Sequence, residues 1–169
     1  PVQSGSDRIL KEMNRLHTRE EYFALIDKIQ EILPGCGVSQ DLIAGFPTET
    51  EEDHQDTLSL MEYVKYDFGY MFTYSERPGT MAGRKMEDDV PEATKKRRLA
   101  EIIEMQRKHS AFRTKSQINT VQEVLIEGTS KKSDEHWMGR TSRNTVTVFP
   151  KENYKPGDFV NVKIHNCTS

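Results

Sequence analysis

Residues 41–50 read DLIAGFPTET, and this stretch decides the fold of the first part of the chain. The mostly apolar run from 38 to 44 predicts a short strand, and Gly45-Phe46-Pro47 turns the chain. Thr50 then caps a helix whose first turn carries three acidic residues, where the helix dipole favours them. Because a second strand is predicted at 68–74, the order strand, helix, strand indicates parallel strands in an α/β fold.

Further helices are predicted in this part of the chain. Thr18 and Glu21 form a capping box before an amphipathic helix that ends near residue 33. Residues 81–90 are expected to be a loop, and Pro91 opens a long helix that runs to about residue 115. We expect the long helix to pack through an apolar stripe, which comprises Leu99, Ile102, Ile103 and Met105.

The pattern changes after residue 115. Runs typical of β-strands at 121–126, 145–149 and 159–164 alternate with turn residues. The expected turns lie at Gly128, Gly139, Asn144 and Pro156-Gly157. This pattern predicts a small antiparallel barrel that forms a separate domain.

Charge is distributed unevenly along the chain. Residues 1–90 carry 9 basic and 18 acidic side chains, whereas residues 91–115 carry 8 basic and 3 acidic. This distribution permits a polyanionic partner at the C-terminal end and discourages one at the N-terminal end. The run Lys-Lys-Arg-Arg at 95–98 is either a solvated helix face or part of such a surface.

The two cysteines, Cys36 and Cys167, lie far apart and form no C-x-x-C pair. This argues against a metal or cluster site within the chain and against a disulfide framework. No apolar run approaches the ~20 residues of a membrane span, and no signal peptide is visible. The histidines are scattered and show no metal-ligand spacing.

The candidate site lies at 45–49 and 75–80, because ligands of such folds bind at the C-terminal ends of the strands. Gly45 allows the backbone to approach a ligand closely, and Glu49 can accept a hydrogen bond from a ribose or an amino group. The alternative is that Gly45 only shapes the turn and Glu49 only interacts with the helix dipole. Arg77 is the candidate for a phosphate or base contact, with an ordinary Pro-Gly turn as the alternative.

Polar residues also lie near the first helix of the chain. Ser4 and Ser6 carry small hydroxyls that suit contacts with a ribose or a carboxylate, or that simply cap the helix. Arg15 can clamp a carboxylate bidentately or remain solvated. The local sequence leaves both interpretations open at each position.

Basic residues flank the single tryptophan of the last domain. Lys131, Lys132, Arg140 and Arg143 fall in two predicted loops, and Trp137 lies between them. Basic loops on a small barrel, with an aromatic ring available for stacking, suit RNA. A polar surface with a tryptophan at the edge of the core is the alternative.

Several motifs stand in a fixed order, namely PVQSGSDRIL at 1–10, MNR at 13–15 with TRE at 18–20, DLIAGFPTETEED at 41–53, and YSERPGTMA at 74–82. In this order and spacing they resemble the methylthiotransferase family of radical S-adenosylmethionine (SAM) enzymes. Residues 116–169 resemble the TRAM domain, a small RNA-binding β-barrel. VLIEGTSKK at 124–132 and GRT at 139–141 look most like the branch that adds a methylthio group to isopentenyl-adenosine beside the anticodon of tRNA.

The resemblance implies an α/β partial (β/α) barrel fragment with a long basic linking helix in residues 1–115. An all-β, OB-like TRAM barrel, with its last strand incomplete, would follow in residues 116–169. The implied cofactors are SAM and two four-iron four-sulfur clusters whose ligands lie outside this chain. The segment alone is therefore expected to be inactive.

The resemblance also implies partners and a location. The partners are the anticodon arm of tRNA and an electron donor that reduces a cluster. The full-length enzyme is expected to be monomeric and cytoplasmic, with no membrane association.

Individual residues receive roles from the same resemblance. Those expected to bind SAM are Gln3, Ser4, Ser6, Arg15, Asp41, Gly45 and Glu49. Those expected at the rim where the RNA base enters are Tyr74, Ser75 and Arg77. Those expected to contact tRNA phosphates are Lys131, Lys132, Arg140 and Arg143, so RNA binding should depend on salt.

Three alternatives stay open. Sister branches of the family act on threonylcarbamoyl-adenosine in tRNA or on an aspartate of a ribosomal protein. A non-catalytic RNA-binding module on a half-barrel scaffold would bind tRNA without iron. An unrelated (β/α) enzyme with an acidic site at Glu49 would be active without clusters, but the basic loops after residue 130 argue against it.

Overall fold

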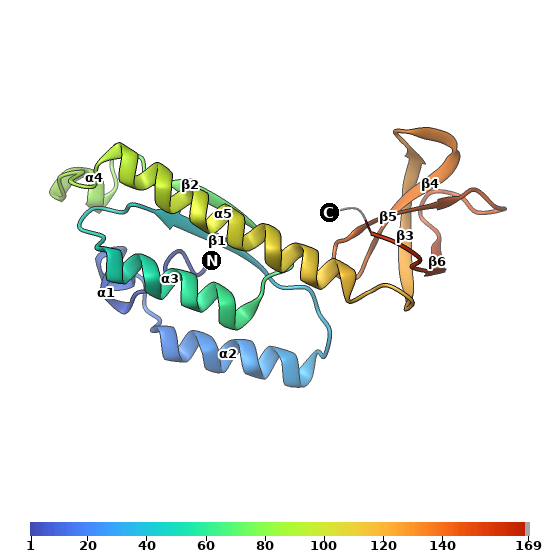
Figure 1. Ribbon diagram of the computed structural model, residues 1–169, viewed down its shortest axis with the longest axis horizontal. Coiled ribbons are helices and arrows are strands. Elements are labelled where there is room, and N and C mark those ends of the chain that lie inside the picture. The colour runs from blue at the N-terminus through green and yellow to red at the C-terminus, as the bar shows by residue number, and fades with distance from the viewer. Residues whose placement is uncertain (168–169) are drawn as a thin grey trace. The chain divides into compact units, whose positions relative to one another are not determined.

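The structure, a computed structural model, describes residues 1–167 and divides into two compact units (Figure 1). The first unit comprises Pro1–Pro34 and Ser39–Ser110, and the second comprises Gly35–Val38 and the chain from Ala111 onward. Each unit has its own sheet. Every helix in the described part of the chain is too short or too polar to cross a membrane.

The first unit contains a two-stranded parallel sheet. β1 (Ser39–Ala44) pairs with β2 (Phe68–Thr73), and the register runs from Ser39 opposite Phe68 to Ala44 opposite Thr73. Gln3 extends this sheet through an isolated parallel bridge to Leu42. The parallel α/β arrangement predicted from the order of the elements is thereby confirmed, while closure into a barrel stays a prediction.

The first unit also contains helices, two of which begin at the N-caps Thr18 and Thr50 that the sequence predicted. Their bounds are α1 (Asp7–Glu12), α2 (Arg19–Ile32), α3 (Glu51–Val64), α4 (Met81–Lys85) and α5 (Glu92–Lys115). Capping boxes at Thr18 and Thr50 start α2 and α3, and in each box an acidic side chain three residues on bonds back to the threonine N–H. Figure 1 shows α3 and α5 alongside the strands, and Gln106 of α5 reaches Gln40 of β1 at 3.4 Å.

The segment predicted as a loop at 81–90 contains the short helix α4, so this prediction was wrong for residues 81–85. Thr80 is the N-cap: its Oγ1 accepts the Gly83 N–H at 3.1 Å and donates to the Arg77 carbonyl at 2.8 Å. A threonine cap can start a single helical turn that is too short to show a hydrophobic period.

The buried face of α5 is mostly polar, whereas the sequence predicted an apolar stripe. Of that stripe only Ile102 is fully buried, and its other members are partly exposed. The remaining buried residues of α5 are Lys95, Arg98, Gln106 and His109. Together with Ile102 they follow one another at three or four positions, which is the spacing of one helix face. Polar contacts therefore fix this helix against the rest of the first unit.

The second unit is a four-stranded antiparallel sheet. Its strands are β3 (Val121–Ser130), β4 (Ser133–Thr141), β5 (Val146–Pro150) and β6 (Phe159–Lys163), in the order β5-β4-β3-β6. One face carries an apolar core of Val124, Ile126, Phe149 and Val160, against which Trp137 and Val162 pack. The predicted all-β character is confirmed, and closure of the sheet into a barrel stays a prediction.

The sequence missed β4 and wrongly placed turns at Gly128 and Gly139. Gly128 lies within β3 beside a shift in register, and Gly139 is paired on both sides, with Ile126 and with Thr147. A Cβ at Gly139 would collide with the carbonyl oxygen of Leu125, so this glycine serves close packing within the sheet. The expected turns at Asn144 and Gly157 are present, with φ angles of 61° and 96°.

Candidate functional site

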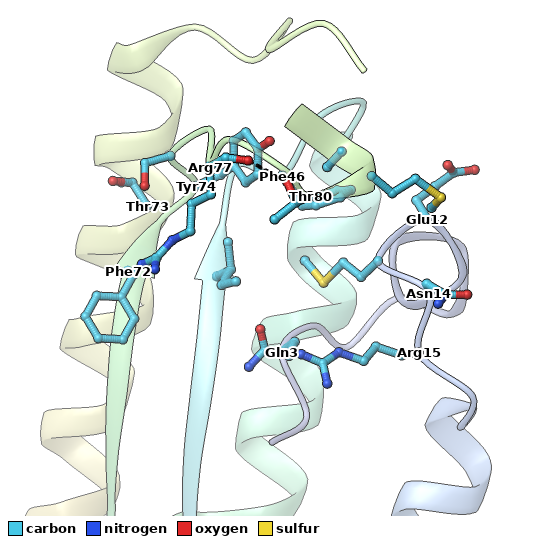
Figure 2. A pocket seen from close by; sticks show the side chains of 15 residues that line it. Gln3, Glu12, Asn14, Arg15, Phe46, Phe72, Thr73, Tyr74, Arg77 and Thr80 are labelled. Atoms are coloured by element: carbon cyan, nitrogen blue, oxygen red, sulfur yellow. Dashed lines mark hydrogen bonds between the residues drawn. The ribbon is translucent and has the colours of Figure 1, made fainter. Parts of the chain in front are cut away.

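A cavity of about 280 Å³ opens at the C-terminal ends of β1 and β2 (Figure 2). Its walls come from the N-terminal segment, the end of α1, both strand ends and the start of α4. Parallel α/β folds bind their ligands at this edge of the sheet. The position of the cavity therefore agrees with the location predicted for the site.

One wall of the cavity is polar. Its residues are Gln3, Glu12, Asn14 and Arg15. Gln3 and Asn14 adopt positive φ angles of 69° and 56°, and the Arg15 N–H donates to the Leu10 carbonyl at 2.8 Å. In Figure 2 the side chain of Arg15 extends toward Gln3. A guanidinium beside an amide group suits a ligand that carries a carboxylate.

A second wall is aromatic. The rings of Phe46 and Tyr74 meet edge to face, with centroids 5.2 Å apart and an interplanar angle of 76°. Lys95 Nζ lies 5.4 Å from the centre of the Tyr74 ring. Burial raises the pKa of the Tyr74 phenol, and the negative charges of Asp88 and Glu76 add to this shift. The phenol is therefore protonated at neutral pH and can donate a hydrogen bond.

The cavity brings together half of the residues predicted for the strand-end site. Gln3, Arg15, Tyr74, Ser75 and Arg77 all line it. The first two had been assigned to SAM and the other three to the rim where a base would enter. Two groups of predicted residues from separate motifs therefore share one cavity.

The sequence assigned no individual role to several other lining residues. Asn14, Phe46 and Thr80 lie beside predicted residues within the quoted motifs, so adjacency was the available signal. Phe72 lies two positions before Tyr74 on β2, on the same side of the strand. Alternation along the strand could have identified this residue.

The remaining predicted residues lie outside the lining of the cavity. The Asp41 carbonyl accepts the Gln3 N–H at 3.0 Å, which holds the N-terminal segment on β1. Ser4 Oγ lies 3.4 Å from Thr57 Oγ1 and accepts the Ser6 N–H at 3.2 Å. Ser6 is the N-cap of α1. The SAM contacts of these residues stay predictions, since their observed hydrogen bonds are internal.

Glu49 and Gly45 form one closed turn. Glu49 Oε2 accepts the Gly45 N–H at 2.7 Å and a hydrogen bond from Arg98 Nη1 at 2.9 Å. Glu49 is 6% exposed. Burial raises the pKa of this carboxyl despite the hydrogen bond from Gly45 and the positive charge of Arg98. The Glu49 carboxylate, which was predicted to contact a ligand, therefore already bonds to Gly45 and Arg98.

Asp53 is buried and lies at the centre of a hydrogen-bond network. It accepts Ser6 Oγ–H at 2.5 Å and Thr50 Oγ1–H at 2.8 Å, and it pairs with Arg8. Burial alone would raise the pKa of Asp53, but the hydrogen bonds from Arg8, Ser6 and Thr50 together hold it well below its usual range. This network ties the segment before α1 to the start of α3.

Glu51, His54 and Glu101 place three possible metal ligands within 4.8 Å of one another. Arg97 already supplies a positive charge there, because its guanidinium pairs with Glu51 and with Glu101 at 2.6 Å each. Its hydrogen bond lowers the pKa of Glu51 to about 2, and the hydrogen bond from Gln55 adds to this effect. The cluster is therefore a salt-bridge network that joins α3 to α5.

The basic residues of the second unit do not gather around Trp137 as predicted. Lys131 and Lys132 form the turn before β4, whereas Arg140 and Arg143 lie at its other end. At about 3.3 Å per residue the two ends of this nine-residue strand are roughly 26 Å apart. Successive turns of an antiparallel sheet lie at opposite ends of its strands, so the two pairs of basic residues are separated.

Trp137 itself packs against the core of the second unit. Lys151 Nζ lies over its ring, 4.4 Å from the centre, and its indole N–H is buried without a partner among the described residues. Arg140 pairs with Glu127 at 3.2 Å and donates to the Asn144 side chain at 3.1 Å. The partly buried indole therefore packs at the edge of the core, and a stacking role toward RNA stays a prediction.

An iron–sulfur cluster does not fit the residues of this chain. Cys36 and Cys167 are free thiols, and both lie outside the cavity lining. Such clusters are held by several cysteine thiolates that converge on one point.

Comparisons with known proteins define the class. Residues 1–61 match the family model of the Radical SAM superfamily, and residues 115–169 match that of the TRAM domain. The chain therefore belongs to the radical SAM superfamily and carries a TRAM domain.

More narrowly, the chain is similar over its whole length to proteins named tRNA-2-methylthio-N(6)-dimethylallyladenosine synthase. It is 76% identical to the protein of Christiangramia forsetii, 68% to that of Flavobacterium johnsoniae and 52% to that of Phocaeicola vulgatus. The chain spans about a third of the length of these relatives. The family predicted from the sequence motifs is confirmed.

Proposed function

We propose that the whole protein adds a methylthio group to N(6)-dimethylallyl-adenosine, also called isopentenyl-adenosine, beside the anticodon of tRNA. The observation that carries this proposal is the cavity at the strand ends, in a chain 76% identical to a protein named for that activity. In this proposal the first unit contributes part of the SAM site and the second unit binds RNA. The segment by itself is inactive.

The cavity suits SAM in its chemistry. Arg15 offers a guanidinium to the carboxylate of the methionine end, and Gln3 offers an amide beside it. Phe46 and Tyr74 offer aromatic surface to the nucleoside end. The volume of about 280 Å³ lies just below the ~300–1,000 Å³ of small-molecule sites, as expected for one part of a larger wall.

Two four-iron four-sulfur clusters complete the proposal, held by cysteines outside this chain. When bound, the clusters and SAM supply the radical, sulfur and methyl chemistry, and an electron donor supplies the reducing equivalents. The residues described here bind and orient. Arg77 and Ser75 line the cavity and are exposed, so in this proposal they contact the incoming nucleoside.

The second unit is proposed to hold the anticodon arm of tRNA. Lys131 and Lys132 are exposed in the β3–β4 turn, where they can approach phosphates. Arg143 belongs to the opposite end of the sheet, so the contacts would be spread along the RNA rather than gathered at one point. We further propose that the whole enzyme acts as a cytoplasmic monomer.

Substitution of Arg15 in the full-length, cluster-reconstituted protein tests the proposed SAM site. Loss of a charged hydrogen bond worth roughly 1.5–3 kcal/mol should weaken SAM binding by about 10- to 100-fold in Arg15→Met. Arg107→Met is the control, because Arg107 is exposed on α5 and lies outside the cavity lining. Equilibrium dialysis with labelled SAM measures both.

Three outcomes separate the possibilities. Weaker SAM binding in Arg15→Met alone supports the assignment. Equal binding by both variants and the unaltered protein removes Arg15 from the site. Failure of the unaltered, reconstituted protein to bind SAM contradicts the proposed function itself.

A further inference from the structure

The start of α5 meets the strand-end turns through two buried cations. Lys95 and Arg98 are 3% and 4% exposed, although both belong to a run of four basic residues. Burial of a charged side chain is costly unless an opposite charge pairs with it. Two buried cations close together therefore indicate a specific structural role. Their partners are Glu49, in the turn after β1, and Asp88, shortly before α5.

Arg98 holds the turn that ends β1. Its Nη1 donates to the Glu49 carboxylate at 2.9 Å and to the Glu49 carbonyl at 3.0 Å. The same carboxylate accepts the Gly45 N–H at 2.7 Å. One guanidinium from α5 therefore contacts the carboxylate that closes the turn and the backbone at the end of that turn.

Lys95 packs over the other end of the same turn. Gly45 has a φ of 73°, and a Cβ at this position would collide with the side-chain stem of Lys95. The ammonium of Lys95 bonds both oxygens of Asp88, at 2.6 and 2.5 Å, and lies 5.4 Å from the centre of the Tyr74 ring. The stem and the charge of one lysine thus contact both the β1 turn and the ring that follows β2.

The turn and the ring form the aromatic wall of the cavity. Phe46 lies within the Gly45–Glu49 turn, and its ring meets that of Tyr74 edge to face. We propose that Arg98 and Lys95 are positioning residues, which hold Phe46 and Tyr74 in the arrangement that the ligand site requires. This inference rests on the proposed function for the identity of the ligand, and on the described contacts for the positioning itself.

Hydrogen exchange in the full-length protein tests the positioning directly. Arg98→Met should leave the turn less restrained, so amides in the peptide that contains residues 45–49 should exchange roughly tenfold faster than in the unaltered protein. The peptide from α2 serves as an internal reference. Arg97→Met is the matched control, because Arg97 is the neighbouring arginine and pairs with carboxylates at the surface.

SAM affinity of the reconstituted protein supplies a second readout. In Arg98→Met the SAM dissociation constant should rise roughly tenfold, because misplaced lining residues no longer match the ligand. Arg97→Met should change neither exchange nor affinity by more than about twofold. Lys95→Met, which keeps the stem over Gly45, should weaken SAM binding less than Lys95→Ala does.

The neutral double variant Glu49→Gln with Arg98→Met covers the case in which Arg98→Met fails to fold, because it leaves no unpaired buried charge. Faster exchange confined to residues 45–49, together with weaker SAM binding, supports the proposal. Unchanged exchange there, or a uniform rise across the first unit with unchanged SAM affinity, overturns it. If the unaltered protein binds no SAM, the proposed function fails, and the exchange measurement still decides the positioning.

Discussion

Two groups of clustered cations lie in opposite environments. At residues 95–98, at the start of α5, every basic side chain is paired with a carboxylate of the same unit, and two of them are buried. In the second unit Lys131 and Lys132 are exposed in a tight turn. A run of cations in a sequence therefore says little about a polyanion partner until the nearby carboxylates are known.

The largest effect is expected when the buried ion pair between Arg98 and Glu49 is broken. Arg98→Met should lower the free energy of unfolding by about 3–5 kcal/mol, because it leaves Glu49 as an unpaired buried charge. Arg97→Met should cost far less, since its pairs are exposed to solvent. Urea denaturation of both variants measures the difference, and equal losses would contradict the distinction between buried and surface pairs.

A second prediction concerns the acid sensitivity of the first unit. The pKa of Asp53 is depressed by its hydrogen bonds, so its stabilising effect is present above the unfolded value of about 3.9 and is lost as the pH falls below it. Asp53→Asn should cost about 2 kcal/mol at pH 7 and flatten the decline in stability below about pH 4. Unfolding curves at several pH values check this, and parallel curves would argue against the network.

Two glycines with positive φ sharpen the role assigned to Lys95. Gly45→Ala should cost about 1–3 kcal/mol, because it adds a collision with the lysine stem to the strain of the backbone. Gly79 has a φ of 87° but open space around it, so Gly79→Ala carries the strain alone. In thermal unfolding, Gly45→Ala should have a lower melting temperature than Gly79→Ala. The reverse order would contradict the close contact between Gly45 and the Lys95 stem.

The smallest effect is expected from the exposed lysines. Each of Lys131→Ala and Lys132→Ala should reduce the slope of log affinity against log salt for tRNA by about 1. Lys96→Ala should leave this slope unchanged, because Lys96 pairs with Glu92 in the first unit. Filter binding of the full-length protein across a salt series measures the three slopes. A change of slope for Lys96→Ala alone would contradict the assignment of RNA contact to Lys131 and Lys132.

Local signals predicted much of the fold. The capping box at Thr18, the N-cap at Thr50 and the strand-end turn at Gly45 involve residues close in sequence, and all three are present. β4 was not predicted because its polar residues and Gly139 are typical of a loop. Only its pairing with β3 and β5 shows that it is a strand.

The candidate site divides in the same way. Arg77 was a candidate because it follows a predicted strand, whereas Gln3 and Arg15 entered through the family resemblance and the first helix; all three line the cavity. The partnership of Glu49 with Arg98 spans 49 residues and joins two elements that the sequence does not place together. A carboxylate that looked available to a ligand is therefore already bonded within the protein.

A methylthiolation assay on tRNA with the full-length enzyme tests the central comparison most directly. The account predicts that the neutral Glu49→Gln/Arg98→Met variant raises the KM for SAM and leaves the KM for tRNA nearly unchanged. The Lys131→Ala/Lys132→Ala variant should raise the KM for tRNA, more so at high salt, and leave the KM for SAM nearly unchanged. If both variants changed the same KM, the proposed difference between Arg98, which positions the SAM site, and Lys131 and Lys132, which contact RNA, would be contradicted.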